Sequence, residues 1–236
     1  MHVISEWGLS GVEALFDRAD AFIVVDVLSF STCVDVACSN GAIVFPFPIH
    51  DREAAEAEAV RRQAELAGKR SDKTARFSLS APTLQAIDEG TRLVLPSPNG
   101  SHISFAAKGK LVFAGCLRNA TAVARIAMET VGNGTLAVVP AGERWTDRSL
   151  RPAIEDLIGA GAIVSELNGS LSPEAMVARD VFQAARSDLF DRLMGSVSGV
   201  ELCERGFPQD VEIAAKLNVS NCAPVLLEEA YVAAGR

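Results

Sequence analysis

The stretch FIVVDVLSFSTCVDVACSNGA, residues 22–42, decides the fold class of this chain. It opens with an aromatic and β-branched apolar run, which predicts a buried strand over 21–28. The residues from 30 onward follow a helical pattern, and an Asn-Gly pair ends it, as is common at helix C-termini. A buried strand that passes directly into a helix is typical of α/β proteins.

One carboxylate interrupts this apolar strand, and hydroxyl groups follow it. Asp26 stands near the strand's end, and Ser29, Ser31 and Thr32 come next. Such residues at a helix N-terminus can hold an oxyanion together with backbone amides. Asp26 can equally be a cap of the following helix, and this alternative stays open.

The same alternation of strand and helix continues along the chain. Further strands are predicted over 43–47, 91–97, 110–116 and 134–142, and further helices over 51–68, 151–169 and 172–195. We therefore predict an α/β fold with a largely parallel or mixed central sheet, and one domain over 1–236. The polar stretch 68–82 is the best candidate for a long, functional loop.

Composition and charge exclude several classes of function. The net charge of −8 argues against nucleic-acid binding, which needs a basic surface. No apolar run approaches the roughly 20 residues that span a bilayer, and no signal-peptide pattern opens the chain, so we expect a cytoplasmic protein without membrane contact. The five scattered cysteines contain no C-x-x-C pair and favour free thiols. A homo-oligomer stays open.

Polar side chains follow the other predicted strands as well. Because ligands bind beyond the carboxyl ends of strands in open α/β sheets, we expect these side chains to converge on one rim. The candidates that join those after the first strand are Asn99, Gly100, Arg118, Asn119, Glu143, Glu155 and Asp156. Carboxylates, amides and hydroxyls suit Mg²⁺ and a phosphate, since Mg²⁺ takes one or two carboxylates and keeps several waters.

Simpler interpretations of these residues remain. Glu155 and Asp156 can complement a helix dipole, which contributes roughly 0.3–1 kcal/mol each. Asn99 with Gly100 is most often a turn, and Asn119 can cap a helix.

Four blocks in order also carry a resemblance to a known family. They are VVDVLSFSTCVDVACSNGA, PSPNGSHISFAAKGKLVFAGCLRNATAVA, SLRPAIEDLIGAGAIVSEL and GVELCERGFPQDVEIAAKLNVSNCAPVL. The chain resembles the 2-phosphosulfolactate phosphatase family of the coenzyme M pathway over most of its length. The resemblance implies a three-layer α/β/α fold. It also implies Mg²⁺-dependent hydrolysis of 2-phosphosulfolactate, a small anionic phosphorylated substrate, to sulfolactate and phosphate.

The resemblance also points to site residues by position. It implies Asp26, Glu155 and Asp156 as catalytic and metal-binding residues. Asn99 and Asn119 would orient the phosphate or the substrate carboxylate.

One departure bears on the substrate. Ser29 stands where the family has an arginine, and serine cannot replace a guanidinium as an anion partner. Charge can come instead from one of several other cations: Lys69, Arg70, Arg76, Arg118 or Arg144. A changed substrate and an anion-binding module without turnover are the alternatives.

Overall fold

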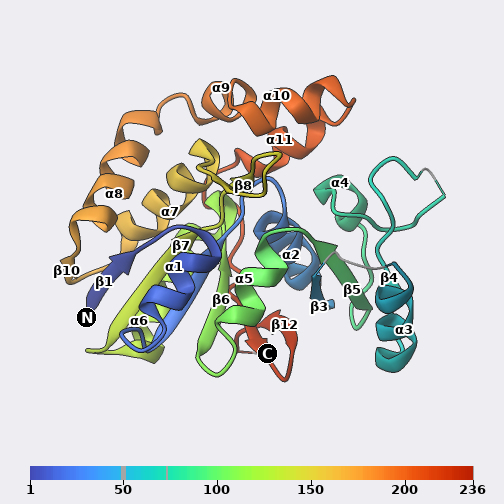
Figure 1. The fold of residues 1–236 in the computed structure, drawn as a ribbon, viewed down its shortest axis with the longest axis horizontal. Coiled ribbons are helices and arrows are strands. Elements are labelled where there is room, and N and C mark those ends of the chain that lie inside the picture. Colours follow the sequence, from blue (N-terminus) through green and yellow to red (C-terminus); the bar gives the residue numbers. More distant parts are fainter. Residues whose placement is uncertain (49–51, 73, 236) are drawn as a thin grey trace.

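The computed structural model describes residues 1–48, 52–72 and 74–235. Ten of its strands form one sheet, in the order β10-β1-β7-β2-β6-β11-β12-β3-β5-β4 (Figure 1). These strands are β1 (His2–Ser5), β2 (Ala21–Val25), β3 (Ile43–Pro48), β4 (Glu65–Leu66), β5 (Arg92–Ser97), β6 (Leu111–Gly115), β7 (Thr135–Pro140), β10 (Ser170–Leu171), β11 (Pro224–Leu227) and β12 (Ala230–Ala233). A separate hairpin pairs β8 (Glu143–Arg144) with β9 (Leu150–Arg151).

The sheet is mixed. Two parallel groups, β10-β1-β7-β2-β6 and β3-β5-β4, are joined by the antiparallel pair β11-β12 near the C-terminus. The predicted α/β fold with a parallel or mixed sheet is confirmed. The pattern of short apolar runs did not reveal this C-terminal hairpin, which turns at Glu228 and Glu229, both with positive φ.

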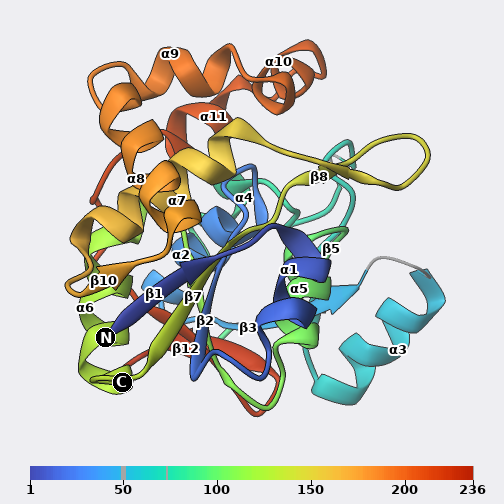
Figure 2. The same ribbon diagram turned by 60° about the vertical axis from the view of Figure 1, so that its left-hand side comes forward.

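Helices cover both faces of the sheet, because β2 is apolar on both sides. Ile23 and Val25 belong to one core and Phe22 and Val24 to the other. The helices are α1 (Gly8–Leu15), α2 (Phe30–Ser39), α3 (Arg52–Arg62), α4 (Ala81–Leu84), α5 (Gly100–Ala106), α6 (Ala120–Val131), α7 (Ile154–Glu166), α8 (Pro173–Ala185), α9 (Leu189–Met194), α10 (Val197–Glu204), α11 (Pro208–Ala214) and the 3₁₀ turn η1 (Leu117–Asn119). Figure 2 shows α6, α7 and α8 on one side of the strands and α1 and α5 on the other.

Two predicted helices are shorter than expected. The helix predicted over 51–68 ends at Arg62, because Gln63 has a φ of 51° and the following residues pair with β5 as β4. Asp51, the first residue of this predicted helix, lies outside the described residues. The helix predicted over 151–169 begins only at Ile154, because Arg151 pairs with Glu143 in the β8-β9 hairpin.

The later segments gather beyond the carboxyl edge of the parallel strands. Helices α9, α10 and α11 and the β8-β9 hairpin lie there, above β6 and β7 in Figure 1. This arrangement encloses the region where the sequence predicts a site. None of the described helices combines the length and apolar character that crossing a bilayer requires.

Candidate active site

Asp26 is the first residue after β2, and its carboxylate is held by two backbone amides. Oδ1 accepts from the Phe30 amide at 3.1 Å, at the start of α2, and Oδ2 accepts from the Gly100 amide at 3.0 Å, at the start of α5. The side chain therefore links two helix N-termini, whose partial positive charge favours an anion. Asp26 does bond to the helix that follows it, but it also reaches a second helix.

Gly100 fits this contact because it lacks a side chain. A Cβ at this position would meet the Phe30 ring and would lie 2.9 Å from Oδ2 of Asp26. The close approach of α5 to Asp26 therefore requires glycine.

Asp156 is buried in the first turn of α7. Its Oδ1 accepts from the Val27 amide at 2.7 Å, and its Oδ2 accepts from the Gly142 amide at 2.9 Å. The two amides belong to the segments that follow β2 and β7. Asp156 thus fixes the backbone next to Asp26 and next to Glu143.

Glu143 lies on β8. Its Oε2 accepts from Nδ2 of Asn99 at 2.7 Å, and Oδ1 of Asn99 accepts from Nε of Arg144 at 3.4 Å. The structure therefore brings together Asp26, Asn99, Gly100 and Glu143, although they come from three separate segments. Convergence at the carboxyl edge of the sheet was the expectation from the sequence.

Burial and mutual repulsion raise the pKa values of these acids. Burial raises the pKa of Asp26 to about 6; the Phe30 and Gly100 amides lower it, and the negative charge of Glu155 raises it. Burial, followed by the charge of Asp26, raises the pKa of Glu143 to about 7.

The pKa of Asp156 is raised well above its usual range by burial and by the charges of Asp26, Glu155 and Glu143. Four carboxyl groups therefore interact in one place. Strongly raised pKa values such as those of Asp26, Glu143 and Asp156 are typical of a functional site.

A cavity of about 410 Å³ opens over Asp26, and we call it the Asp26 cavity. Its acidic lining residues are Asp26, Glu143 and Glu201, and its basic ones are Arg70, Arg144, Arg151 and Arg205. Glu155 and Asp156 are not among its lining residues; they are 2% and 3% exposed and lie behind it. A lining that contains both acids and arginines suits a phosphate ligand that binds together with a cation.

Ser29 also lines this cavity, and a guanidinium reaches it from another element. Nη2 of Arg70 donates to Ser29 Oγ at 3.0 Å and also to the Leu79 carbonyl oxygen. Arg70 belongs to the stretch 68–82, which the sequence marked as a functional loop. One of the five candidate cations thus contacts the position where the family has an arginine.

Ser97 contributes a hydroxyl with no bonding partner. It ends β5 and lines the Asp26 cavity. Its Oγ is buried and accepts or donates no hydrogen bond within the described part of the chain. Because an unpaired buried hydroxyl is costly, a ligand in the cavity is a natural partner for it.

Two hydroxyls predicted to bind substrate are engaged with the backbone of their own segment. Ser31 Oγ donates to the Val24 carbonyl oxygen at 2.9 Å and accepts from the Asp26 amide at 3.0 Å. Thr32 Oγ1 donates to the Val27 carbonyl oxygen at 2.8 Å. Both side chains are fully buried and shape the turn that carries Asp26.

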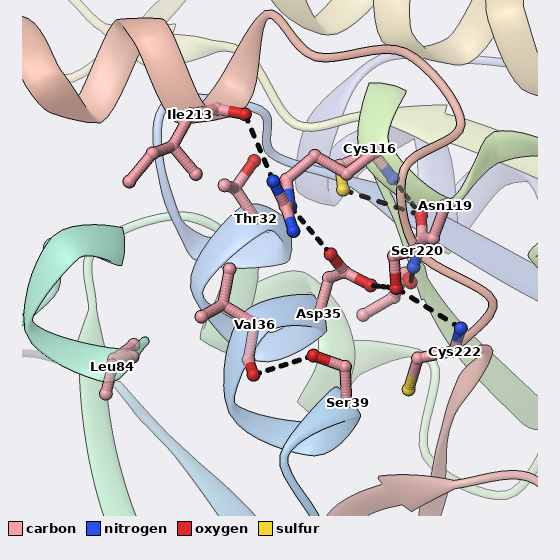
Figure 3. Close-up of polar contacts among 12 residues, drawn as sticks. Thr32, Asp35, Val36, Ser39, Leu84, Cys116, Asn119, Ile213, Ser220 and Cys222 are labelled. Atoms are coloured by element: carbon pink, nitrogen blue, oxygen red, sulfur yellow. Dashed lines mark hydrogen bonds and ion pairs between the residues drawn. The ribbon is translucent and has the colours of Figure 1, made fainter. Parts of the chain in front are cut away.

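Arg118 and Asn119 are not brought to the Asp26 cavity. Nε of Arg118 donates to Asp35 Oδ2 at 2.8 Å, and Oδ1 of the same aspartate accepts from Ser220 Oγ at 2.6 Å (Figure 3). Asn119 Oδ1 accepts from the Cys116 amide at 2.9 Å, within its own turn (Figure 3). These contacts join α2 to η1 and to the segment after α11.

The donor set fits Mg²⁺ without forming a complete cage. The described residues contain no group of three or more His, Cys, Asp or Glu side chains placed to hold a metal ion. Mg²⁺ needs only one or two carboxylates, because waters and a phosphate complete its shell. Asp26 and Glu143 line the cavity, and their carboxylate oxygens keep lone pairs beyond the hydrogen bonds that they accept.

Sequence reasoning missed three charged residues of the described cavity lining. Arg151 was assigned to a helix, and Glu201 and Arg205 lie in the last block of the family resemblance, which assigned them no role. The signal for Arg151 was the proline after it, because the residue before a proline is biased away from helix. No local signal marks Glu201 or Arg205, which α10 and the turn after it place at the cavity.

The fold and the cavity define an α/β protein with an acidic, arginine-lined site at the carboxyl edge of its sheet. The model of the 2-phosphosulpholactate phosphatase family matches residues 12–229. A "Probable 2-phosphosulfolactate phosphatase" of Pseudothermotoga lettingae is 30% identical over 218 residues, 89% of this chain and 91% of the relative.

A 2-phosphosulfolactate phosphatase of Methanothermobacter thermautotrophicus is 32% identical over 204 residues, 86% of this chain and 85% of the relative. A "Probable 2-phosphosulfolactate phosphatase" of Carboxydothermus hydrogenoformans is 32% identical over 213 residues, 86% of this chain and 85% of the relative. The chain belongs to the 2-phosphosulpholactate phosphatase family.

Proposed function

We propose that this chain is a Mg²⁺-dependent phosphatase that hydrolyses a small anionic 2-phospho acid, with 2-phosphosulfolactate as its substrate. The observation that carries the proposal is the joint lining of one cavity by Asp26, Glu143 and four arginines. Its relatives support the substrate, because their names specify it.

In this reaction the bond from phosphorus to the substrate oxygen breaks and a bond from a water oxygen forms. The products are sulfolactate and phosphate. Asp26 would hold the Mg²⁺ on the cavity side, and the ion would neutralise phosphate charge when bound. The arginines would bind the phosphate and the acidic groups of the substrate, since a guanidinium pairs with them through two hydrogen bonds.

Glu143 is the residue best suited to move the proton. Burial and the neighbouring carboxylates raise its pKa to about 7, so both its protonation states are available near neutral pH. It would accept a proton from water or give one to the leaving oxygen. The hydrogen bond from Asn99 fixes its orientation.

Phosphate release from 2-phosphosulfolactate tests the proposal. We expect release in the presence of Mg²⁺, loss of release with EDTA, and recovery when Mg²⁺ is added back. The panel includes phospholactate and 2-phosphoglycerate, because Ser29 replaces an arginine of the family and a changed substrate is the main alternative.

Two variants link turnover to this cavity. Asp26→Asn and Glu143→Gln are expected to abolish release, and circular dichroism checks that each still folds. Folded wild-type protein that releases phosphate from none of these substrates would refute the phosphatase. If those compounds nevertheless raise its melting temperature, the chain is an anion-binding module without turnover.

A further inference from the structure

A second cavity, of about 400 Å³, lies beside the Asp26 cavity. Lys69 lines it, so we call it the Lys69 cavity. Arg70, Leu79 and Arg205 line both cavities, so the two are neighbours that share a wall. The second cavity is large enough for a small organic ligand, since ligand pockets are commonly about 300–1,000 Å³.

The charged side chains of the Lys69 cavity are all cationic. They are Arg52, Lys69, Arg70 and Arg205, and no acidic residue is among its described lining residues. The described lining of this cavity is therefore positively charged, although the chain as a whole has a net charge of −8. Within the described ranges Lys69 and Arg205 form no salt bridge, whereas Arg52 pairs with Glu56 on the surface and Arg70 Nε lies 3.6 Å from Asp210 Oδ2.

The remainder of the lining is largely apolar. Phe47 on β3, Leu66 on β4 and Pro96 on β5 are half-buried and form one wall. Leu79 completes it from the loop that also carries Lys69. Cations at an apolar wall match a ligand that has an anionic head and an apolar body.

We propose that the Lys69 cavity is a second binding site, which takes an organic carboxylate or sulfonate with an apolar body. A metal cation would find no acidic ligand among the described lining residues. A neutral apolar molecule would leave Lys69 and Arg205 without a charged partner among the described residues. The site goes beyond the proposed phosphatase activity. Its occupant would contact Arg70, which also lines the Asp26 cavity and donates to Ser29 there.

Calorimetric titration with hexanoate and with hexanesulfonate tests the site without relying on turnover. We expect both anions to bind, and hexanol and hexylammonium not to bind. Lys69→Gln should weaken hexanoate binding by about tenfold, as expected for loss of a charged partner. Lys216→Gln is the matched control, because Lys216 is exposed and lines neither cavity, and it should leave the affinity unchanged.

Two arms of the titration distinguish the sources of such an anion. Hexanoate that binds equally well in saturating inorganic phosphate is a separate ligand. The other arm compares 6-phosphooxyhexanoate with inorganic phosphate. If 6-phosphooxyhexanoate binds more tightly, and Lys69→Gln removes this difference in affinity without changing the affinity for phosphate, the cavity holds the far end of a phosphorylated substrate. Both results support the site.

The proposal is overturned if wild-type protein binds neither anion, or if hexanol or hexylammonium binds as well as hexanoate. It is also overturned if Lys69→Gln binds hexanoate as tightly as Lys216→Gln does. Because binding is measured directly, these results do not depend on whether the chain hydrolyses phosphate esters.

Discussion

Asp26 Oδ2 accepts a hydrogen bond from the Gly100 amide at 3.0 Å, although β6, β11, β12 and β3 separate β2 from β5 in the sheet. The loop after β5 returns across the carboxyl edge, and α5 then packs against β2. The contact places an aspartate between two helix N-termini and sets the floor of the Asp26 cavity.

Gly100→Ala tests this contact. The added methyl group would meet the Phe30 ring and Asp26 Oδ2, so α5 or the carboxylate must move. We expect a loss of about 1–3 kcal/mol in the free energy of unfolding, as is typical of overpacking. Phosphate release should fall further than the unfolded fraction explains, because Asp26 is displaced. Denaturant titration and initial rates measure the two effects, and an unchanged rate would argue against the role of this contact.

Arg118→Ala separates a structural role from substrate binding. The substitution leaves Asp35 buried without its cationic partner, so we expect a loss of about 3–5 kcal/mol in stability. KM of the protein that remains folded should not change. Arg125→Ala is the control, because its exposed pair with Glu129 contributes below about 1 kcal/mol. A raised KM at unchanged stability would instead indicate that Arg118 binds the substrate.

Ser97→Ala should weaken ligand binding and not weaken the fold. Ser97 Oγ is buried without a partner in the described residues, so its removal is expected to stabilise the free protein by up to about 1 kcal/mol. Inorganic phosphate or substrate should bind about tenfold more weakly once this hydroxyl is lost. Ser101→Ala is the control, since Ser101 Oγ already donates to the Leu95 carbonyl oxygen. If Ser97→Ala and the wild type bind inorganic phosphate and substrate with equal affinity, Ser97 does not contact these ligands.

The buried acids predict how the metal-free protein responds to pH. The folded-state pKa of Asp26 is raised from 3.8 to about 6, so the folded protein binds protons more tightly than the unfolded chain does. Stability from this group is therefore present below about pH 4 and is lost as the pH rises towards about 6. The loss is on the order of 3 kcal/mol. Glu143 extends the same trend towards about pH 7.

Thermal unfolding in EDTA, followed across this pH range, measures that loss. Asp26→Asn should flatten the profile, because the amide does not ionise. If Mg²⁺ binds these carboxylates, adding it should raise the melting temperature most at the alkaline end, where they are charged. A metal-free melting temperature that rises steadily through this window would contradict the raised pKa values.

Much of the site's location, but less of its membership, was predictable. Asp26, Asn99 and Glu143 each follow a strand, and the rule that parallel strands present their carboxyl ends at one edge is enough to group them. That rule does not say which polar side chains remain available to a ligand. Arg118 follows a strand too, but it bonds to Asp35 instead. The Ser31 hydroxyl forms its hydrogen bonds with the backbone turn around Asp26.

By itself, the sequence determined the α/β class and the edge of the sheet where the site lies, because apolar periodicity and chain order encode local structure. Only the tertiary structure decided that Gly100 meets Asp26, that Asp156 supports the cavity from behind, and that Arg70 reaches Ser29. These relationships join segments far apart in the chain. They depend on which buried hydrogen-bond donors and acceptors pair with each other when the core packs. A local pattern of residues does not specify these pairs.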